Sequence, residues 1–246
     1  MRQAPRDDDP ERCEEALLEI MPRDRRKIYD ARTLVAAVLD QGSLFEMTAG
    51  YGRSQITALA RLDGIPVGIW ANDPPIYGGS MDAEGSQKVT RFVRMCETFH
   101  LPMVALVDEP GFMIGPASEA ACTIRYGGAT IHDVMESRPP WMARLLRCSH
   151  GGHAAAHFGP EATVLAWPSA EAGALPLEGG VAVAFRREIE AAADPDAKRA
   201  ELEEMLAKGR NPFGRAETFG VNDLIDPRST RPALCDWLDW VEPLLR

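Results

Sequence analysis

The sequence predicts an α/β fold, because fully apolar runs of strand length alternate with segments whose apolar residues recur at helical spacing. Residues 103–107 form one such run, which is typical of a strand buried on both faces of a sheet. A helix is expected to begin near Asp82, with these apolar residues on one face: Val89, Phe92, Val93 and Cys96. A helix followed by a buried strand is the rhythm of βαβ folds.

Two further patterns precede this unit. The apolar residues of 33–39 fall at helical spacing, so a helix is expected there. The runs 56–62 and 67–71 are short, apolar and bounded by Asp and Gly. They predict two strands joined by a turn at Asp63-Gly64.

The elements after the central strand continue the alternation. They are two helices at 117–125 and about 128–137, a helix beginning at the pair Gly151-Gly152, and a strand at 163–166. The secondary structure of residues 142–147 is only poorly indicated by the sequence. Residues 198–208 are rich in Glu, Ala, Leu and Lys, which predicts a surface helix. An amphipathic segment with Trp237 and Trp240 closes the sequence.

Length and composition indicate one globular domain. The chain has 246 residues, 45% of them hydrophobic, which is enough for a single α/β core. Its formal charge of −10 argues against a nucleic-acid partner, because a polyanion needs a basic face. Residues 1–27 are charged and interrupted by proline, with a short helical candidate at 11–21. They are interpreted as a tether or partner-contacting arm, and residues 28–246 as the domain.

The cysteines and the apolar runs indicate the compartment. No basic start precedes an apolar run of signal-peptide length, and no 18 consecutive residues are apolar, so a cytoplasmic chain without a membrane partner is expected. The five cysteines are scattered without Cys-x-x-Cys spacing. This pattern indicates neither a disulfide framework nor a zinc site, and buried thiols are expected.

Glycine-bearing turns are the chemically informative feature. The pair Gly151-Gly152 opens a segment of small residues, where backbone N–H groups at a helix start can approach a negatively charged ligand. Such preset donors are the physical basis of an oxyanion hole. Two other turns of this kind lie upstream, at Gly78-Gly79 and at Pro110-Gly111-Phe112.

With these turns, the chain resembles the carboxyltransferase component of biotin-dependent acyl-CoA carboxylases. The resemblance is to the C-terminal half of the propionyl-, acetyl- or methylcrotonyl-CoA carboxylase type, and runs from about Tyr29 to Pro232. The motifs occur in family order: Tyr29-Asp30, residues 64–68, Ala71-Asn72, residues 79–82, Lys88, residues 91–93, residues 110–112, residues 166–168 and residues 211–213.

The resemblance implies a crotonase/ClpP-like superhelix of ββα units and a site for carboxybiotin. In the family this half holds carboxybiotin on its carrier, while the preceding half, absent here, holds the acyl-CoA. By position, the backbone amides of Gly152 and His153 would bind the ureido oxygen of biotin as negative charge develops there. The cofactor-binding residues implied are Gly78, Gly79, Gly111, Phe112 and Gly151. Phe112 is either an apolar wall for the biotin rings or a buried residue that ends a strand.

The sequence departs from the family pattern beside the glycine pair. Members usually have a small residue where His153 stands, and several have Tyr-Asp where Ala154-Ala155 stand. The imidazole would narrow the biotin slot, or, with a pKa of about 6.5, would exchange a proton at neutral pH.

Two other kinds of site are considered and not favoured. His150, His153 and His157 are spaced like metal ligands, but no carboxylate or thiolate accompanies them, so they are assigned to a polar cleft edge and no metal is expected. Asp108, Glu109 and Glu171 would suit acid/base work, but a solvated loop edge is favoured.

The function implied by the resemblance is transfer of a carboxyl group from carboxybiotin to an acyl-CoA. The expected partners are an N-half carboxyltransferase subunit, a biotin carboxyl carrier protein and the acyl-CoA, in a homo- or hetero-oligomer. Two alternatives stay open. One is a crotonase-type decarboxylase of a malonyl-type thioester, and the other is a catalytically silent paralogue with a structural role. The sequence does not name the acyl group.

Overall fold

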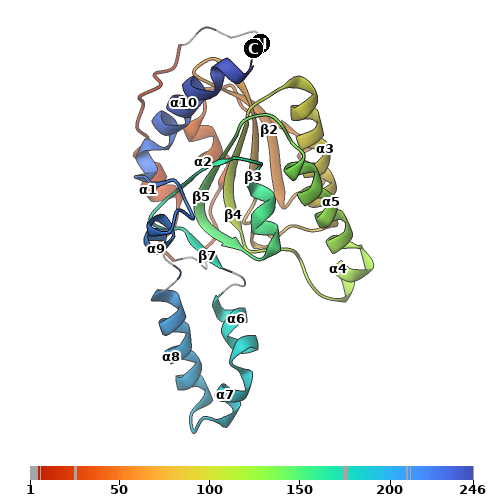
Figure 1. Cartoon of the computed structure of the whole chain (residues 1–246), viewed down its shortest axis with the longest axis vertical. Helices are drawn as coiled ribbons and strands as arrows, with labels where there is room; N and C mark the ends of the chain where they lie inside the picture. The colour runs from red at the N-terminus through yellow and green to blue at the C-terminus, as the bar shows by residue number, and fades with distance from the viewer. Residues whose placement is uncertain are drawn as a thin grey trace.

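The structure, a computed structural model, describes residues 5, 7–24, 27–173, 177–208, 210 and 212–245. In this part of the chain the centre is an eight-stranded sheet with the order β1-β2-β3-β4-β5-β6-β8, in which β7 also pairs with β5 (Figure 1). The strands are β1 (Phe45–Met47), β2 (Gln55–Leu62), β3 (Ile65–Asn72), β4 (Met103–Glu109), β5 (Trp141–His150), β6 (Thr163–Ala166), β7 (Glu171–Gly173) and β8 (Asp223–Leu224).

The hairpin of β2 and β3 confirms the predicted strand pair. The two strands are antiparallel, and Leu62 pairs with Ile65 across the turn. Asp63 and Gly64 both have positive φ, at 47° and 75°, which is what a tight turn between twisted strands requires. The Asp40 carboxylate accepts both turn amides, at 2.9 Å from Asp63 and 2.8 Å from Gly64.

The rest of the sheet is parallel, from β3 through β4, β5 and β6 to β8. β4 confirms the strand predicted at 103–107, and all seven of its residues are buried. β5 covers the poorly marked residues 142–147. Two arginines, Arg144 and Arg147, interrupt its apolar run, which explains why the pattern is not apparent in the sequence.

Helices cover both faces of the sheet (Figure 1). One face packs against α2 (Ala31–Val38) and α10 (Thr230–Val241), with Leu34 and Leu238 in the shared core. The other packs against α3 (Ala83–Phe99), and α3 in turn contacts α5 (Thr123–Met135). The helix predicted from Asp82 is therefore confirmed.

Asp82 caps α3, because its carboxylate accepts the Gly85 amide at 2.7 Å. The helix boundary after β4 differs from the sequence prediction. α4 (Pro116–Ala120) ends early, and Cys122, in the left-handed region at φ 59°, separates it from α5. Gly128, where a helix was expected to begin, lies inside α5.

The described residues of the expected N-terminal arm pack on the α2 and α10 face. Leu17, in the single-turn helix α1 (Leu17–Ile20), is fully buried. The fully buried Arg231 guanidinium donates to the Asp9 carbonyl at 2.9 Å and to the Asp40 carboxylate at 2.8 Å. Arg12 donates to the Ala37 and Leu39 carbonyls at the end of α2. α1 is shorter than the predicted helix at 11–21, and the residues before it instead make hydrogen bonds to Arg231 of α10 and to the carbonyls at the end of α2.

A helical hairpin extends away from the sheet (Figure 1). It consists of α6 (Leu177–Ala184), α7 (Arg186–Ala191) and α8 (Pro195–Lys208), and α9 (Pro212–Glu217) follows it. α8 confirms the helix predicted at 198–208. The hairpin has its own small core of Val181, Ile189 and Leu202.

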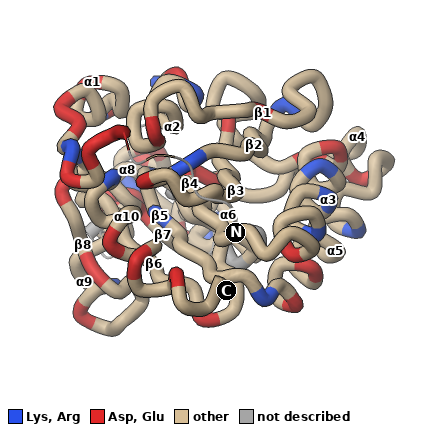
Figure 2. The backbone as a smooth tube through the Cα atoms, turned by 90° about the horizontal axis from the view of Figure 1, so that it is seen from above, with Lys and Arg blue, Asp and Glu red and all other residues tan. Residues whose placement is uncertain are grey.

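Surface properties complete the fold. Lys and Arg are interspersed with Asp and Glu over the described elements (Figure 2). No helix in the described residues combines the length and hydropathy needed to cross a membrane. Cys13 and Cys122 are exposed, so the expectation of buried thiols is wrong for these two. Cys96 and Cys235 are buried, which raises the pKa of each thiol to about 12.

Candidate functional site

The structure brings two of the predicted glycine turns together where β3 and β4 end. Gly78 and Gly79 lie in the short 3-10 helix η1 (Tyr77–Gly79), which follows β3. Met81, just beyond it, forms a parallel bridge with Phe112. Its amide donates to the Gly111 carbonyl at 3.1 Å, and its carbonyl accepts the Met113 amide at 2.9 Å. The two turns are therefore one hydrogen-bonded unit.

Close backbone approach requires glycine at position 79. Its φ is 88°, and a Cβ built there would lie 2.9 Å from the Asp108 carbonyl oxygen. Gly111, at φ 123°, faces the next strand, since its built Cβ would lie 3.7 Å from the His150 carbonyl oxygen. The Gly111 turn therefore lies between the Gly79 loop and the end of β5.

The amides of these turns are largely committed within the protein. The Gly79 amide donates to the Ile76 carbonyl at 2.9 Å, and the Gly151 amide donates to the Gly173 carbonyl of β7 at 3.1 Å. The Gly111 amide donates to a carboxylate oxygen of Glu109 at 2.8 Å. The N–H groups of these three glycines therefore already have acceptors within the protein, and close backbone approach explains the glycine at position 79.

The segment at the glycine pair is a 3-10 helix, η2 (Gly152–His157), and not the α-helix expected from the sequence. Gly152 is exposed, and a Cβ built on it would meet nothing within 4 Å. The protein thus leaves open space beside the backbone of Gly152. The side chains of His153, Ala154 and Ala155 lie outside the described residues.

Phe112 is half-buried and directed at α5. A Cβ built on Gly127 would overlap the Phe112 ring, so the phenyl group lies directly on the glycine backbone. Only a residue without a side chain fits beneath this ring. Gly127 is a supporting residue that the sequence analysis missed, although the pair Gly127-Gly128 inside a helical pattern was a signal for it.

The expectation that Asp108 and Glu109 lie on a solvated loop edge is wrong. They are 1% and 0% exposed, at the end of β4. Asp108 accepts hydrogen bonds from the Tyr29 hydroxyl at 3.0 Å, the Cys148 amide at 3.0 Å and the Arg147 guanidinium at 2.9 Å. Burial, with the Asp108 charge, raises the pKa of Tyr29 well above its usual value. The buried ion pair joins β4 to β5 beneath the turns.

Glu109 faces the opposite side of the sheet. Its carboxylate accepts the Gly111 amide and the Asn72 side-chain amide, each at 2.8 Å. Burial raises the pKa of this carboxyl well above its ordinary value. Glu171, the third carboxylate considered, lies half-buried in β7, opposite Cys148 in the strand register.

Two histidines are also more buried than expected. His150 is 3% exposed and His157 is 0% exposed, so the assignment to a polar cleft edge is wrong for both. The His157 carbonyl accepts the Trp141 indole N–H at 2.8 Å. Within the described residues, no group of three or more His, Cys, Asp and Glu residues is arranged to hold a metal ion.

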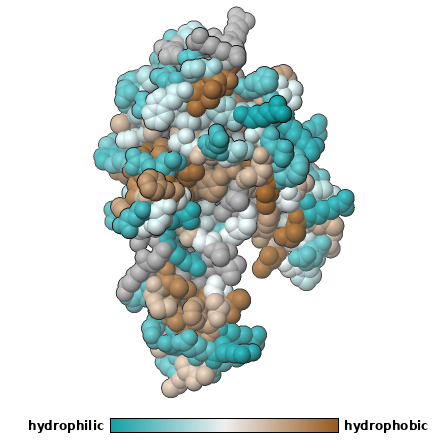
Figure 3. All heavy atoms as spheres, viewed as in Figure 1, coloured by the Kyte–Doolittle hydropathy of each residue, from teal (hydrophilic) through white to brown (hydrophobic). Residues whose placement is uncertain are grey.

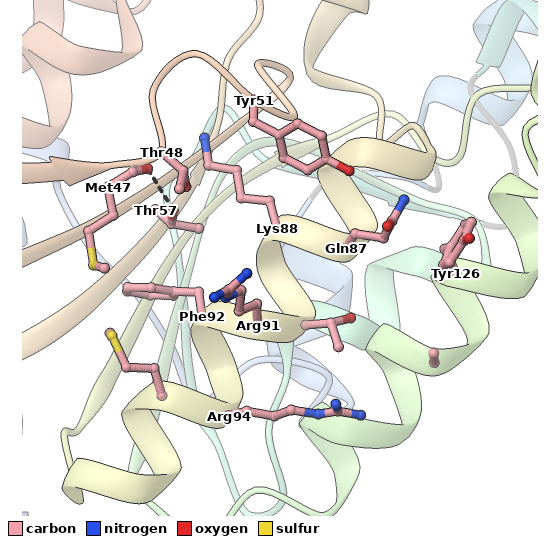
Figure 4. A pocket seen from close by; sticks show the side chains of 13 residues that line it. Met47, Thr48, Tyr51, Thr57, Gln87, Lys88, Arg91, Phe92, Arg94 and Tyr126 are labelled. Atoms are coloured by element: carbon pink, nitrogen blue, oxygen red, sulfur yellow. Dashed lines mark hydrogen bonds between the residues drawn. The ribbon is translucent and has the colours of Figure 1, made fainter.

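A recess separates the helical hairpin from the side of α4 and α5, with apolar atoms on both sides of it (Figure 3). A distinct cavity of about 1050 Å³ lies between β1 and the helices α3 and α5 (Figure 4). Met47, Phe92 and Met95 supply part of its apolar lining, and Lys88 reaches in from α3. The Lys88 ammonium donates to the Gln55 carbonyl at 2.7 Å, and burial lowers its pKa. The predicted glycine turns do not line this cavity in the described structure.

Comparison with known proteins identifies relatives of this arrangement. A carboxyl transferase domain model matches residues 1–241. The propionyl-CoA carboxylase carboxyltransferase subunit of Haloferax mediterranei is 39% identical over 92% of this chain and 45% of its own length. The methylmalonyl-CoA carboxyltransferase 12S subunit of Propionibacterium freudenreichii subsp. shermanii is 40% identical over 91% of this chain and 43% of its own.

Solved structures agree with these relatives. A transcarboxylase 12S crystal structure, with methylmalonyl-coenzyme A and methylmalonic acid bound, superimposes with a TM-score of 0.91 at 37% identity. The match covers 98% of this chain and 47% of the 12S chain. The α/β, crotonase-like fold expected from the sequence is therefore confirmed. The chain spans less than half the length of the curated relatives it matches.

Proposed function

Because the chain belongs to the carboxyl transferase domain family, we propose that it supplies the carboxybiotin-binding half of an acyl-CoA carboxyltransferase. The observation that supports this most is the meeting of the glycine turns at the carboxyl ends of β3, β4 and β5, with open space beside Gly152. Ligands in open α/β sheets bind at this edge.

Each residue of the site is assigned a separate role in carboxyl transfer. Carboxybiotin on a carrier protein supplies the carboxyl group, and its ring carries negative charge at the ureido oxygen when that group leaves. The backbone amides of Gly152 and His153 are assigned to that oxygen as preset donors. Gly79 and Gly111 keep the neighbouring backbone close without filling the space, and Gly151 fixes the start of η2 to β7. Phe112, held over Gly127, borders the same edge.

The acyl-CoA is assigned to a separate N-half subunit. Carboxyl transfer needs a second oxyanion site for the enolate of the thioester, besides the one assigned to Gly152 and His153. The acyl-CoA, a biotin carboxyl carrier and an N-half subunit are thus the proposed partners. A higher oligomer is also proposed, since the 12S relative is described as a hexamer.

One comparison favours a second candidate. The methylmalonyl-CoA decarboxylase alpha subunit of Veillonella parvula is 34% identical over 94% of this chain. The same half-site would serve a reaction that starts from a malonyl-type thioester and removes its carboxyl group. The direction of transfer then distinguishes the two candidates.

The test is reconstitution of the full chain with an N-half subunit and biotinylated carrier. Carrier labelled with ¹⁴C-carboxyl is mixed with propionyl-CoA or acetyl-CoA, and acid-stable label in the thioester is counted. The proposal expects transfer with both partners present and none with either omitted. Labelled carrier formed from methylmalonyl-CoA, without net transfer to acyl-CoA, favours the decarboxylase. No transfer in either direction favours the silent paralogue and contradicts the proposal.

A further inference from the structure

The carboxyl group of Glu109 lies directly beneath the joined glycine turns. It is 0% exposed, and both of its oxygens accept hydrogen bonds from the loops of the site. Oε1 accepts the Gly111 amide at 2.8 Å, and Oε2 accepts Nδ2 of Asn72 at 2.8 Å. The Met81 amide, which donates to the Gly111 carbonyl, also acts to lower the pKa of this carboxyl. One side chain therefore contacts the end of β3, the Met81 bridge and the Gly111 turn.

The orientation of Asn72 is fixed by its other partners. Its Oδ1 accepts the Asp108 amide at 2.9 Å, so its Nδ2 must face Glu109. The same Nδ2 donates to the Gly79 carbonyl at 3.3 Å and to Oε1 of Gln55 at 3.2 Å. The donor side of Asn72 is thus turned toward three acceptors, and Glu109 is the nearest of them.

Gln55 is fixed in the same way. An indole N–H only donates, so Oε1 of Gln55 must be the atom that accepts Trp70 Nε1 at 2.9 Å. Its Nε2 then donates to the Gly79 carbonyl at 3.1 Å. Gln55 and Asn72 are 0% and 1% exposed, so this network is closed to water. The polarity of every hydrogen bond in it follows from the donor-only indole and the backbone amides.

We propose that Glu109 is a positioning residue for carboxyl transfer, which sets the Gly111 turn against the Gly79 loop so that their backbones border the biotin ring. The carboxylate accepts from Gly111 and Asn72 through separate oxygens, and these two hydrogen bonds favour its charged form against the effect of burial. A glutamine at this position would place its NH₂ against one of these two donors, because neither donor can be reversed. This inference rests on the proposed function, since the ligand for which Glu109 positions the turns is the carboxybiotin assigned to this site.

The first test does not depend on activity. Amide hydrogen exchange is measured at Gly111 by NMR with ¹⁵N-glycine-labelled full-length chain, in the wild type and in Glu109→Gln. The Gly111 amide is expected to be protected in the wild type and to exchange at least about tenfold faster in the variant, the effect of losing about 1.4 kcal/mol. An unprotected Gly111 amide in the wild type, or equal exchange in both proteins, overturns the proposal.

Asp40→Asn is the matched control. Asp40 is also a carboxylate that accepts two turn amides, those of Asp63 and Gly64, but on a turn between β2 and β3. This variant loses at least as much, because Asp40 also accepts the buried Arg231 guanidinium at 2.8 Å, and its Gly111 amide is still expected to exchange as in the wild type. Faster exchange at Gly111 in Asp40→Asn would show general loosening and would count against a local role of Glu109.

The second test uses the reconstituted enzyme. Glu109→Gln is expected to lower kcat/KM for the carboxylated carrier about tenfold by raising its KM, and to leave the KM for acyl-CoA unchanged. A purely structural role would lower kcat with the folded fraction and leave both KM values unchanged, which overturns the proposal. If the wild type shows no transfer, the proposed function fails, and exchange at Gly111 still decides whether Glu109 holds the turn.

Discussion

The imidazole of His157 lies stacked on the indole of Trp70, with ring centroids 3.9 Å apart and planes inclined by 18°. Trp70 is on β3 and donates its N–H to Gln55, while His157 ends η2. This stack attaches the segment that begins at Gly152 to the strand that leads to the Gly79 loop.

Replacing His157 with Ala is expected to lower the free energy of unfolding by about 2–4 kcal/mol, because the ring is fully buried and its removal leaves a cavity. Urea denaturation followed by tryptophan fluorescence measures the change. His132→Ala is the control, since its imidazole is largely exposed, and a change within about 0.5 kcal/mol is expected there. Equal effects of the two substitutions would show that the stack does not stabilise the fold.

Gly127 and Gly128 provide a matched pair on α5. Gly127→Ala places a methyl group against the Phe112 ring and is expected to cost about 1–3 kcal/mol by overpacking. A Cβ built on Gly128 meets nothing within 4 Å. Gly128→Ala is therefore expected to raise the free energy of unfolding by about 0.5–1 kcal/mol, because alanine favours the helix more than glycine does. Thermal unfolding of the two variants gives the sign of each effect. Stabilisation by both would mean that Phe112 moves aside at no cost.

Gly152→Val tests the open space beside the glycine pair. A built Cβ meets no atom within 4 Å and φ is not in the left-handed region, so the variant is expected to fold. The valine side chain is expected to block the ligand's approach to the Gly152 N–H, and so to remove about 2.7–4 kcal/mol of transition-state stabilisation in carboxyl transfer, the effect of one oxyanion donor out of reach. Rates from the reconstituted enzyme and circular dichroism of the variant measure both effects. Unchanged transfer would remove this turn from the mechanism.

His153→Ala keeps the backbone amide and removes the imidazole. If His153 acts only through its N–H, transfer is expected to be preserved or improved, because the substitution widens the biotin slot. The same reconstituted assay measures it, with Gly152→Val as the inactive reference. A folded His153→Ala protein without activity would assign a chemical role to the imidazole.

Arg144 is fully buried on β5, between Leu106 and Leu165 in the strand register. Its three guanidinium nitrogens have no hydrogen-bond partner within the described residues, and burial lowers its pKa to about 9. Arg144→Leu is expected to raise the free energy of unfolding by about 1–4 kcal/mol, because a buried charge is replaced by an apolar side chain.

Arg231→Leu is the contrasting variant. Arg231 is equally buried, but it is hydrogen-bonded to Asp9 and Asp40, so its loss is expected to cost about 3–5 kcal/mol. Urea denaturation of both variants compares them directly. Destabilisation of similar size in the two proteins would show that Arg144 has a stabilising partner.

The sequence predicts elements whose residues share one environment. Apolar runs and an Asp-Gly turn predict β2, β3 and β4, and the capping Asp82 predicts the start of α3. Each of these signals is local in the sequence. β5 is not apparent, since Arg144 and Arg147 break its pattern and are tolerated only through burial against particular neighbours. The motifs locate the glycine turns, but which amides those turns leave open depends on contacts from distant segments.

The buried carboxylates show the same limit. Asp108 and Glu109 follow a buried strand and precede Pro-Gly, a pattern that favours an exposed turn. Their burial depends on Tyr29, Asn72 and Arg147, which lie 36 or more residues away along the chain. Such pairings are tertiary, and periodicity within a window does not contain them.

Among the residues whose burial the structure describes, the hairpin of α6, α7 and α8 has a core of three buried apolar side chains, whereas the sheet has two extensive cores. A unit with so little buried surface is expected to open at a lower free energy than the sheet, as a separate cooperative unit of lower stability. The hairpin borders the recess of Figure 3. Local unfolding of the hairpin is therefore expected to change the wall of that recess while the sheet and the glycine turns stay folded, and limited proteolysis is expected to cut the hairpin first.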